Sequence, residues 1–249
     1  MNKLLDIQNL RVDFKSDGKD LTVLNGISFH VEKGETLGIV GESGCGKSVT
    51  SLSIMRLLPI PPGKISSGKI IYDNKDLLLL KEKEMRKIRG NEISMIFQEP
   101  MTSLNPVFTI GRQLDEVLLL HRDISKKVAR ERSIQMLKLV GIARPEQIYE
   151  CYPYELSGGM RQRVMIAMGL ACEPKLLIAD EPTTALDVTI QAQILQLMKE
   201  LKEKTDTSIM LITHDLGVIA EMCDRVIVMY AGEIVEQTDV DTLFNNPKH

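Results

Sequence analysis

The sequence of 249 residues contains no tryptophan, and aromatic residues make up only 4% of it. Long hydrophobic runs are missing as well, because stretches such as residues 77–80 and 226–230 are far too short to span a bilayer. Near the N-terminus, polar residues such as Asp6 and Arg11 interrupt the apolar ones, so we expect no signal peptide. Any role at a membrane therefore requires a partner that crosses it.

Cysteine and excess charge are also scarce. The four cysteines, Cys45, Cys151, Cys172 and Cys223, lack the spacing of a zinc or iron–sulfur site, and they are too few for a disulfide-rich secreted domain. We therefore expect reduced thiols in the cytosol. A net charge of −3 leaves no basic excess, so we expect no nucleic acid partner. The remaining composition, 43% hydrophobic and 26% charged, is that of a globular protein with a sizeable core.

Strand-like and helix-like patterns alternate along most of the chain. Strand patterns cover residues 4–14, 22–31, 36–40, 69–72, 93–97, 175–179, 208–212 and 225–229. Helical patterns cover residues 47–58, 109–121, 125–141 with Ser125 as N-cap, 159–172, 188–204 and 216–222. This alternation predicts an α/β fold with a mostly parallel sheet covered on both faces. The helical stretch from about residue 101 to 155 predicts an inserted subdomain.

A glycine-rich segment follows the third strand pattern and opens a helix. It fits the phosphate-loop pattern G-x-x-x-x-G-K-[ST] with Gly41, Glu42, Ser43, Gly44, Cys45, Gly46, Lys47 and Ser48, and Val49 and Thr50 follow it. Glycines let backbone N–H groups turn toward a triphosphate, and the helix N-terminus adds partial positive charge. Lys47 can bridge the terminal phosphates, and the Ser48 hydroxyl can coordinate Mg²⁺. The segment predicts a nucleoside triphosphate site without indicating what the energy does.

Two acidic residues end another buried strand pattern. Asp180 and Glu181 follow the apolar residues 175–179, and such a strand delivers its last residues to the carboxyl edge of the sheet, where ligands bind. We expect Asp180 to hold Mg²⁺ and Glu181 to polarise the attacking water, although a solvated acidic pair is the alternative. Gln98 and His214 each follow a strand pattern in the same way, and Gln98 can reach both metal and water. His214 is interpreted as catalytic, with a purely structural histidine as the alternative.

A second candidate anion site lies in residues 156–162, Leu-Ser-Gly-Gly-Met-Arg-Gln. Ser157 is a predicted helix cap, and Gly158 and Gly159 can expose N–H groups at the positive end of the helix. The segment resembles the signature sequence of ATP-binding-cassette (ABC) ATPases. In that family each ATP lies between the phosphate loop of one protomer and the signature of the other. The resemblance therefore implies that two chains meet head to tail.

The other motifs of the family follow in order along the whole chain. The resemblance implies a phosphate-loop NTPase fold with a mostly parallel core sheet, an N-terminal antiparallel β subdomain and an inserted α-helical subdomain. It implies one nucleotide-binding domain, residues 1–249, with its core at about 1–98 and 157–249. The helical signature subdomain would occupy about 99–156 and extend into the helix after Ser157. It also implies adenine stacking on Phe14, although an aromatic residue there can simply be core, and a role for Asp187 beside the signature.

A narrower resemblance is carried by residues 98–106, Gln-Glu-Pro-Met-Thr-Ser-Leu-Asn-Pro, by residues 46–50 and by the ending 244–249. These are similar to the ATPases of the oligopeptide, dipeptide and nickel importers, so peptide import is expected and import of nickel or another small solute is the alternative. In that group the chain continues further, often with a cysteine cluster, which implies a C-terminally truncated sequence, with a short natural variant as the alternative. Expected partners are a second ATPase subunit, identical or paralogous, two transmembrane permease subunits and an external or periplasmic substrate-binding protein. Such a subunit lies peripherally on the cytoplasmic face of the membrane.

Three other classes of ATP-binding protein share some of these motifs. DNA-maintenance ATPases carry the signature but usually insert long coiled coils, and residues 98–157 show no heptad run. A phosphate-loop kinase requires neither Glu181 beside Asp180 nor the signature. A non-hydrolysing regulatory module is disfavoured because Glu181, Gln98 and His214 are all present. The sequence therefore predicts a Mg²⁺-dependent ATPase that energises a transporter.

Overall fold

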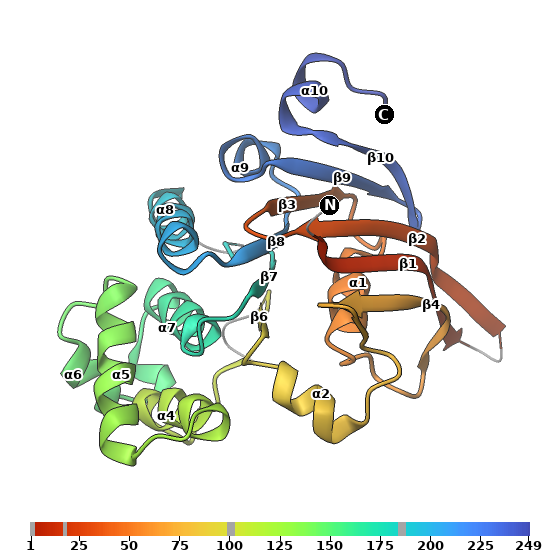
Figure 1. Cartoon of the computed structure of the whole chain (residues 1–249). Coiled ribbons are helices and arrows are strands. Elements are labelled where there is room, and N and C mark those ends of the chain that lie inside the picture. The colour runs from red at the N-terminus through yellow and green to blue at the C-terminus, as the bar shows by residue number, and fades with distance from the viewer. Residues whose placement is uncertain (1–2, 17–18, 99–102, 184–187) are drawn as a thin grey trace. The chain divides into compact units, whose positions relative to one another are not determined.

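In the computed structural model, residues 3–16, 19–98, 103–183 and 188–249 are described (Figure 1). The chain divides into two compact units, Met1–Met85 with Ser208–His249, and Arg86–Thr207. The short helix α2 (Glu82–Ile88) contains the boundary between them.

The first unit holds an antiparallel sheet of four strands in the order β2-β1-β4-β5. Its strands are β1 (Lys3–Ser16), β2 (Lys19–Glu32), β4 (Gly63–Tyr72) and β5 (Lys75–Asp76). β1 pairs antiparallel with both β2 and β4. The sequence pattern predicted that β4 begins at residue 69, but the strand begins at Gly63, which pairs with Phe14. The predicted N-terminal antiparallel subdomain is therefore confirmed.

The same unit holds strands in the order β10-β9-β3-β8, of which β3 lies parallel to both β8 and β9. They are β3 (Thr36–Gly41), β8 (Ser208–Ile212), β9 (Arg225–Tyr230) and the antiparallel edge strand β10 (Glu233–Asp239). All of β8, and all of β3 except its last residue, is buried, as expected for parallel strands covered on both faces. The helices are α1 (Lys47–Ile54), α9 (Leu216–Met222) and α10 (Val240–Asn245).

Helix α1 is shorter than its sequence pattern, which predicted helix to residue 58. The helix ends at Ile54, and Arg56 adopts a left-handed backbone with φ of 52°. The Arg56 guanidinium Nη1 donates to the carbonyls of Leu77 and Leu80 at 3.0 and 2.7 Å. Tertiary hydrogen bonds thus outweigh the helical pattern at residues 55–58.

The second unit combines two parallel strands, β6 (Ile93–Ile96) and β7 (Leu176–Asp180), with a set of helices. These are α4 (Ile110–His121), α5 (Lys126–Leu139), α6 (Pro145–Glu150), α7 (Gly158–Leu170) and α8 (Val188–Thr205), with a 3₁₀ turn at Pro153–Glu155. Ser125 caps α5 as predicted, because its side chain accepts from the N–H of Val128. Helices α2, α6 and α10, together with strands β5 and β10, had no counterpart among the predicted elements.

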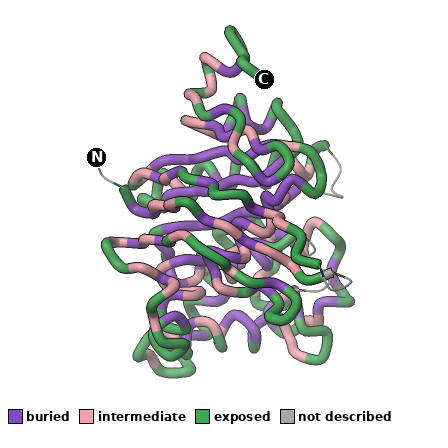
Figure 2. Tube along the Cα trace, turned by 90° about the vertical axis from the view of Figure 1, so that its right-hand side faces the viewer, coloured by how far each residue is buried: buried purple, intermediate pink, exposed green. Residues whose placement is uncertain are grey.

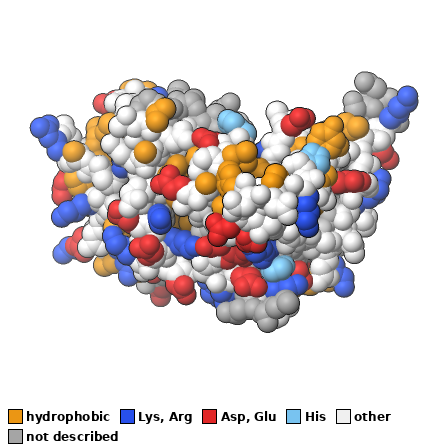
Figure 3. Space-filling view, turned by 90° about the horizontal axis from the view of Figure 1, so that it is seen from above, with side chains coloured by type: hydrophobic (Ala, Val, Ile, Leu, Met, Phe, Trp, Pro, Cys, Tyr) orange, Lys and Arg blue, Asp and Glu red, His pale blue; other side chains and the backbone are white. Residues whose placement is uncertain are grey.

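Each unit has its own buried cluster. In the first unit Val40, Ile219, Val226 and Leu243 pack together, and in the second Leu118, Ala129 and Cys172 do. The last residues, 244–249, are all exposed, as the green end beside the label C shows in Figure 2. Acidic and basic side chains are interspersed on the face of the molecule shown in Figure 3.

Candidate functional site

The phosphate loop lies between β3 and α1 in the first unit. Gly41, Gly44 and Gly46 have φ values of 154°, 82° and 106°, which are left-handed backbone conformations that favour glycine. A Cβ at Gly46 would lie 2.5 Å from Leu24 Cδ2, and one at Gly41 would overlap the Met229 carbonyl. Strands β2 and β9 therefore leave room only for a glycine backbone at these two positions.

The Lys47 side chain is turned into this loop. Its ammonium Nζ donates to the carbonyl oxygens of Gly41 and Glu42 at 2.8 and 3.0 Å, and only 6% of the residue is exposed. Cys45 Sγ lies 4.0 Å from the same Nζ. The Thr50 hydroxyl is buried and donates to the Gly46 carbonyl at 3.0 Å, so it supports the first turn of α1. The positive charge of Lys47 thus stands beside the backbone that the sequence assigns to phosphate binding.

Phe14 and His214 also belong to the first unit. Phe14 is half-buried on β1, and a Cβ at Gly63 on β4 would lie 3.1 Å from its ring. His214 is exposed and precedes Asp215, whose side chain caps α9 by accepting from the N–H groups of Gly217 and Val218. The Phe14 ring is therefore fixed on one side by β4, and the His214 imidazole stands at the carboxyl end of β8.

The second unit brings Gln98 and Glu181 together. β6 and β7 run parallel, with Ile96 opposite Ala179, so the residues that follow them share one edge. Gln98 Nε2 donates to Glu181 Oε2 at 3.2 Å, while Asp180, the last residue of β7, is only 4% exposed. The structure thus brings together two of the residues that the sequence assigns to hydrolysis.

Glu181 has an unusual backbone, with φ of 46°. A left-handed conformation costs free energy for a residue with a Cβ, and a following proline restricts the backbone further. Pro182 follows, and its carbonyl accepts a buried hydrogen bond from Gln162 Nε2 on α7. Sequence reasoning missed this contact, although a polar residue on the buried side of α7 was a signal for it.

The signature segment opens α7. Ser157 is the N-cap, and its Oγ accepts from the N–H of Met160 at 3.3 Å. Gly158 is exposed, and a Cβ there would meet nothing within 4 Å, whereas one at Gly159 would lie 3.1 Å from Ile190 Cγ2 of α8. The first turn of α7 is therefore open to a ligand at Gly158 and packed at Gly159. Asp187 and residues 99–102 of the importer-like segment lie outside the described residues.

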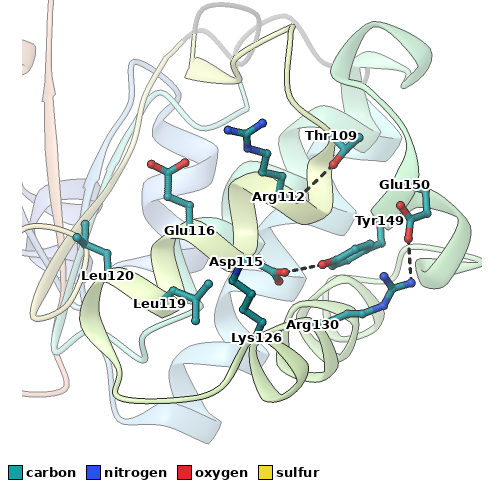
Figure 4. A pocket seen from close by; sticks show the side chains of 10 residues that line it. All are labelled: Thr109, Arg112, Asp115, Glu116, Leu119, Leu120, Lys126, Arg130, Tyr149 and Glu150. Atoms are coloured by element: carbon teal, nitrogen blue, oxygen red, sulfur yellow. Dashed lines mark hydrogen bonds and ion pairs between the residues drawn. The ribbon is translucent and has the colours of Figure 1, made fainter.

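A pocket of about 680 Å³ lies among α4, α5 and α6, and none of the predicted site residues lines it (Figure 4). Asp115 accepts hydrogen bonds there from the Tyr149 hydroxyl at 2.5 Å and from the Ser133 hydroxyl at 2.6 Å. Burial, followed by the hydrogen bond and charge of Asp115, raises the pKa of Tyr149 above its ordinary value. Arg130 lies over the Tyr149 ring and pairs with Glu150 at 2.8 Å. These contacts tie three helices together.

The residues predicted to hold a metal offer hard oxygen donors. Ser48 supplies a hydroxyl, Gln98 an amide oxygen and Asp180 a carboxylate, a set that suits Mg²⁺ together with phosphate oxygens. Among the described residues there is no group of three His, Cys, Asp or Glu side chains able to hold a metal ion. All four cysteines are free thiols in the structure. Within the described part of the chain, no helix is both long enough and apolar enough to span a bilayer.

Comparison with known proteins gives concordant matches. The family model described as ABC transporter matches residues 24–184. Two Bacillus subtilis proteins, the oligopeptide transport ATP-binding proteins OppD and AppD, are each 59% identical over the whole chain, which spans 70% and 76% of their lengths. The dipeptide transport ATP-binding protein DppD of the same organism is 58% identical over the whole chain, which spans 74% of it.

Solved structures agree in fold. A dimeric post-hydrolysis state of the ATP-binding cassette MJ0796, bound to ADP and Pi, superposes with a TM-score of 0.85 at 29% identity, covering 95% of this chain and 98% of that one. The cbiO1 protein of Clostridium perfringens, described as part of the ABC transporter complex cbiONQ, gives a TM-score of 0.82 at 28% identity. That match covers 99% of this chain and 92% of the other.

Proposed function

Since the chain belongs to the ABC transporter family of ATPases, we propose that its ATP hydrolysis energises the import of oligopeptides or dipeptides. The observation that carries the peptide assignment is the identity of 58–59%, over the full chain, to three peptide-transport ATP-binding proteins. Import of nickel or another small solute remains the alternative, because an ATP-binding subunit need not touch the cargo.

Nucleotide binding is assigned to the first unit. Residues 41–48 wrap the phosphates with backbone N–H groups, the N-terminus of α1 adds positive charge, and Lys47 exchanges its carbonyl partners for phosphate oxygens. Val49 and Thr50 continue the helix behind the loop. The Phe14 ring, supported by Gly63, provides a flat apolar surface for adenine.

Hydrolysis is assigned to Gln98, Asp180, Glu181 and His214, acting on the nucleotide held by the phosphate loop. Mg²⁺, held by Ser48, Asp180 and Gln98, would neutralise charge on the phosphate oxygens. Glu181 accepts a hydrogen bond from the attacking water and orients its oxygen toward the terminal phosphorus, and the Gln98 amide holds Glu181 in place. Lys47 and His214 donate to the developing charge on the transferred group.

A second chain would complete the site. The open first turn of α7, with Ser157, Gly158 and Gly159, suits the phosphates of a nucleotide bound by the partner protomer, and Asp187 is placed beside it by resemblance. The dimeric arrangement of the similar cassette MJ0796 supports this assembly. The partner ATPase is either identical or a paralogue. The division into a core of about residues 1–98 and 157–249 and a helical subdomain of about 99–156 belongs to the same proposal.

The helical subdomain would contact the permease. A pocket of about 170 Å³ in the second unit is lined by apolar side chains that include Phe97, Leu104, Val117, Met165 and Met168. Phe97 is 38% exposed and directly precedes Gln98, whose amide donates a hydrogen bond to Glu181. An apolar side chain of the permease inserted into this pocket would therefore contact the residue next to Gln98. We therefore place one of two permease subunits on this pocket, at the cytoplasmic face of the membrane, with a substrate-binding protein on the other side.

The substitution Glu181→Gln tests the hydrolytic assignment. It keeps the shape of the side chain and removes the charge that orients water, so we expect MgATP binding to persist and turnover to fall by about 10²- to 10⁴-fold. The exposed Glu131 on α5 provides the control Glu131→Gln, which should hydrolyse ATP like the unaltered chain. Turnover by Glu181→Gln at the rate of that control would remove Glu181 from the mechanism.

The transport assignment needs the full assembly. The chain, combined with its permease subunits and binding protein in lipid vesicles, should hydrolyse ATP faster when a peptide is added outside, and DNA should have no effect. Stimulation by nickel and not by peptides would select the alternative cargo. Stimulation by DNA alone would reject the transporter assignment.

A further inference from the structure

A buried hydrogen bond connects the signature helix to the turn that carries the hydrolytic carboxylate. Gln162, on the second turn of α7, is 2% exposed, and its Nε2 donates to the carbonyl of Pro182. Pro182 directly follows Glu181 and is itself buried. Both partners belong to the second unit, and the contact joins segments that lie 20 residues apart in the sequence.

The turn requires an external constraint. Glu181 holds a φ of 46° just before a proline, a backbone that neither glutamate nor a residue preceding proline favours. Such a conformation persists only where the surroundings determine it. The hydrogen bond from Gln98 at 3.2 Å acts on the side chain of Glu181, whereas the one from Gln162 acts on the backbone of the turn. Both contacts therefore constrain the carboxylate, one through its side chain and the other through the backbone of the turn.

We propose that Gln162 is a positioning residue for ATP hydrolysis, which holds the turn after β7 so that Glu181 faces the attacking water. The inference rests on the proposed function and adds a residue to its mechanism. Because Ser157 and Gly158 open the same helix, Gln162 also connects the end of α7 that would bind the partner's nucleotide to the carboxylate that would act on the chain's own nucleotide.

Two substitutions separate positioning from space-filling. Gln162→Met has nearly the same length and no donor, so the buried Pro182 carbonyl loses its partner and the turn is free to relax. Gln162→Glu has the same shape but places a second acceptor opposite that carbonyl. We expect kcat to fall by roughly 10- to 100-fold in Gln162→Met, as for small misplacements of catalytic groups, and further in Gln162→Glu. The KM for ATP should stay within about threefold, since the phosphate loop is untouched.

The matched control is Gln193→Met. Gln193 lies on α8 in the same unit, is exposed, and accepts from Arg163 Nη2 at 2.7 Å, so the same substitution removes a surface hydrogen bond. Steady-state ATPase kinetics, ATP-dependent dimerisation and thermal unfolding are measured for all variants of the full chain. We expect dimerisation to persist in both Gln162 variants, because the first turn of α7 keeps its cap and its glycines.

Each outcome of these measurements either supports or overturns the positioning role of Gln162. A kcat for Gln162→Met equal to that of Gln193→Met would overturn the inference, as would loss of ATP-dependent dimerisation together with turnover. If one Gln162 variant fails to fold, the other decides, and failure of both would show a purely structural role and overturn it too. Glu181→Gln, measured in parallel, tests the proposed function separately, because unchanged Gln162 variants beside an inactive Glu181→Gln reject only the role of Gln162.

Discussion

The substitution Gly111→Ala should loosen the helical part of the second unit, because Gly111 lies under an aromatic ring. A Cβ on Gly111 in α4 would overlap the Cδ1, Cε1 and Cζ atoms of Tyr149 in α6. The ring cannot easily retreat. Only 7% of Tyr149 is exposed, its hydroxyl donates to Asp115 at 2.5 Å, and the Arg130 guanidinium lies 4.6 Å from its centroid.

Three contributions determine the size of the effect. Forcing a methyl group into a filled space costs about 1–3 kcal/mol. A ring displaced far enough to lose its hydrogen bond to the Asp115 carboxylate loses about 1.5–3 kcal/mol more. Alanine gains at most about 1 kcal/mol over glycine in a helix. The net expectation is that the free energy of unfolding falls by about 1.5–5 kcal/mol, because the overpacking and the lost hydrogen bond outweigh the gain in helix propensity.

The assay is urea unfolding, followed by circular dichroism, for Gly111→Ala in two backgrounds. With Tyr149 present, the midpoint should fall. In the Tyr149→Ala background the ring is gone, and Gly111→Ala should be neutral or stabilising by up to about 1 kcal/mol. The packing argument therefore predicts that the effect of Gly111→Ala on stability changes sign between the two backgrounds. An equal loss in both backgrounds, or no loss with Tyr149 present, would refute the packing argument.

Three further substitutions probe other contacts. Burial, together with the charge of Arg122, lowers the pKa of His121 from 6.5, so the folded chain favours the neutral ring. Because the unfolded chain then binds more protons, stability should decrease as pH falls below about 6.5, and His121→Gln should flatten that dependence in urea unfolding. Arg122→Met removes the donor to the carbonyl of buried Cys172, which lies 2.5 Å from Nη2, and should cost about 1–3 kcal/mol in the same assay. Arg225→Met leaves Glu35, whose side chain is 8% exposed, without the guanidinium at 3.1 Å, and calorimetry should show a loss of about 3 kcal/mol.

Each of these expectations has a contradicting result. A His121→Gln variant that still loses stability in acid as steeply as the unaltered chain would assign the pH dependence to other groups. An unchanged urea midpoint for Arg122→Met would mean that water replaces the guanidinium at the Cys172 carbonyl. For Arg225, a loss no larger than that of a surface substitution would mean that the carboxylate of Glu35 becomes hydrated.

Sequence patterns predicted those elements of the fold that depend on local chemistry. The apolar runs of β3, β7 and β8 are buried in the structure, and Ser125 and Ser157 cap their helices as expected. The end of α1 was predicted incorrectly, because the left-handed Arg56 is held by carbonyls more than 20 residues away along the chain. Periodicity carries no information on such distant partners.

The candidate site likewise contains parts that the sequence predicted and contacts that it did not. Glycine spacing predicts the loop around Lys47, and the strand patterns place Gln98 and Glu181 after strands, although their mutual hydrogen bond was not predicted. The contact of Gln162 with Pro182 was not predictable, because it depends on which face of α7 packs against the turn. Burial of a polar side chain within a motif is the nearest available signal. It indicates that a partner exists without identifying it.

The conformation of Glu181 departs from the backbone preference of its own sequence. A sequence that followed backbone preference would place glycine or asparagine at a φ of 46° and would not follow it with proline. In the proposed mechanism, glutamate at this position trades stability for a carboxylate whose direction is fixed before the substrate arrives. The free-energy cost of orienting it is then met once, on folding, and not at every catalytic cycle. Gln98 contacts the side chain of Glu181 and Gln162 contacts the backbone of the turn, so the proposed role of Glu181 depends in part on a residue of α7 that is distant from it in the sequence.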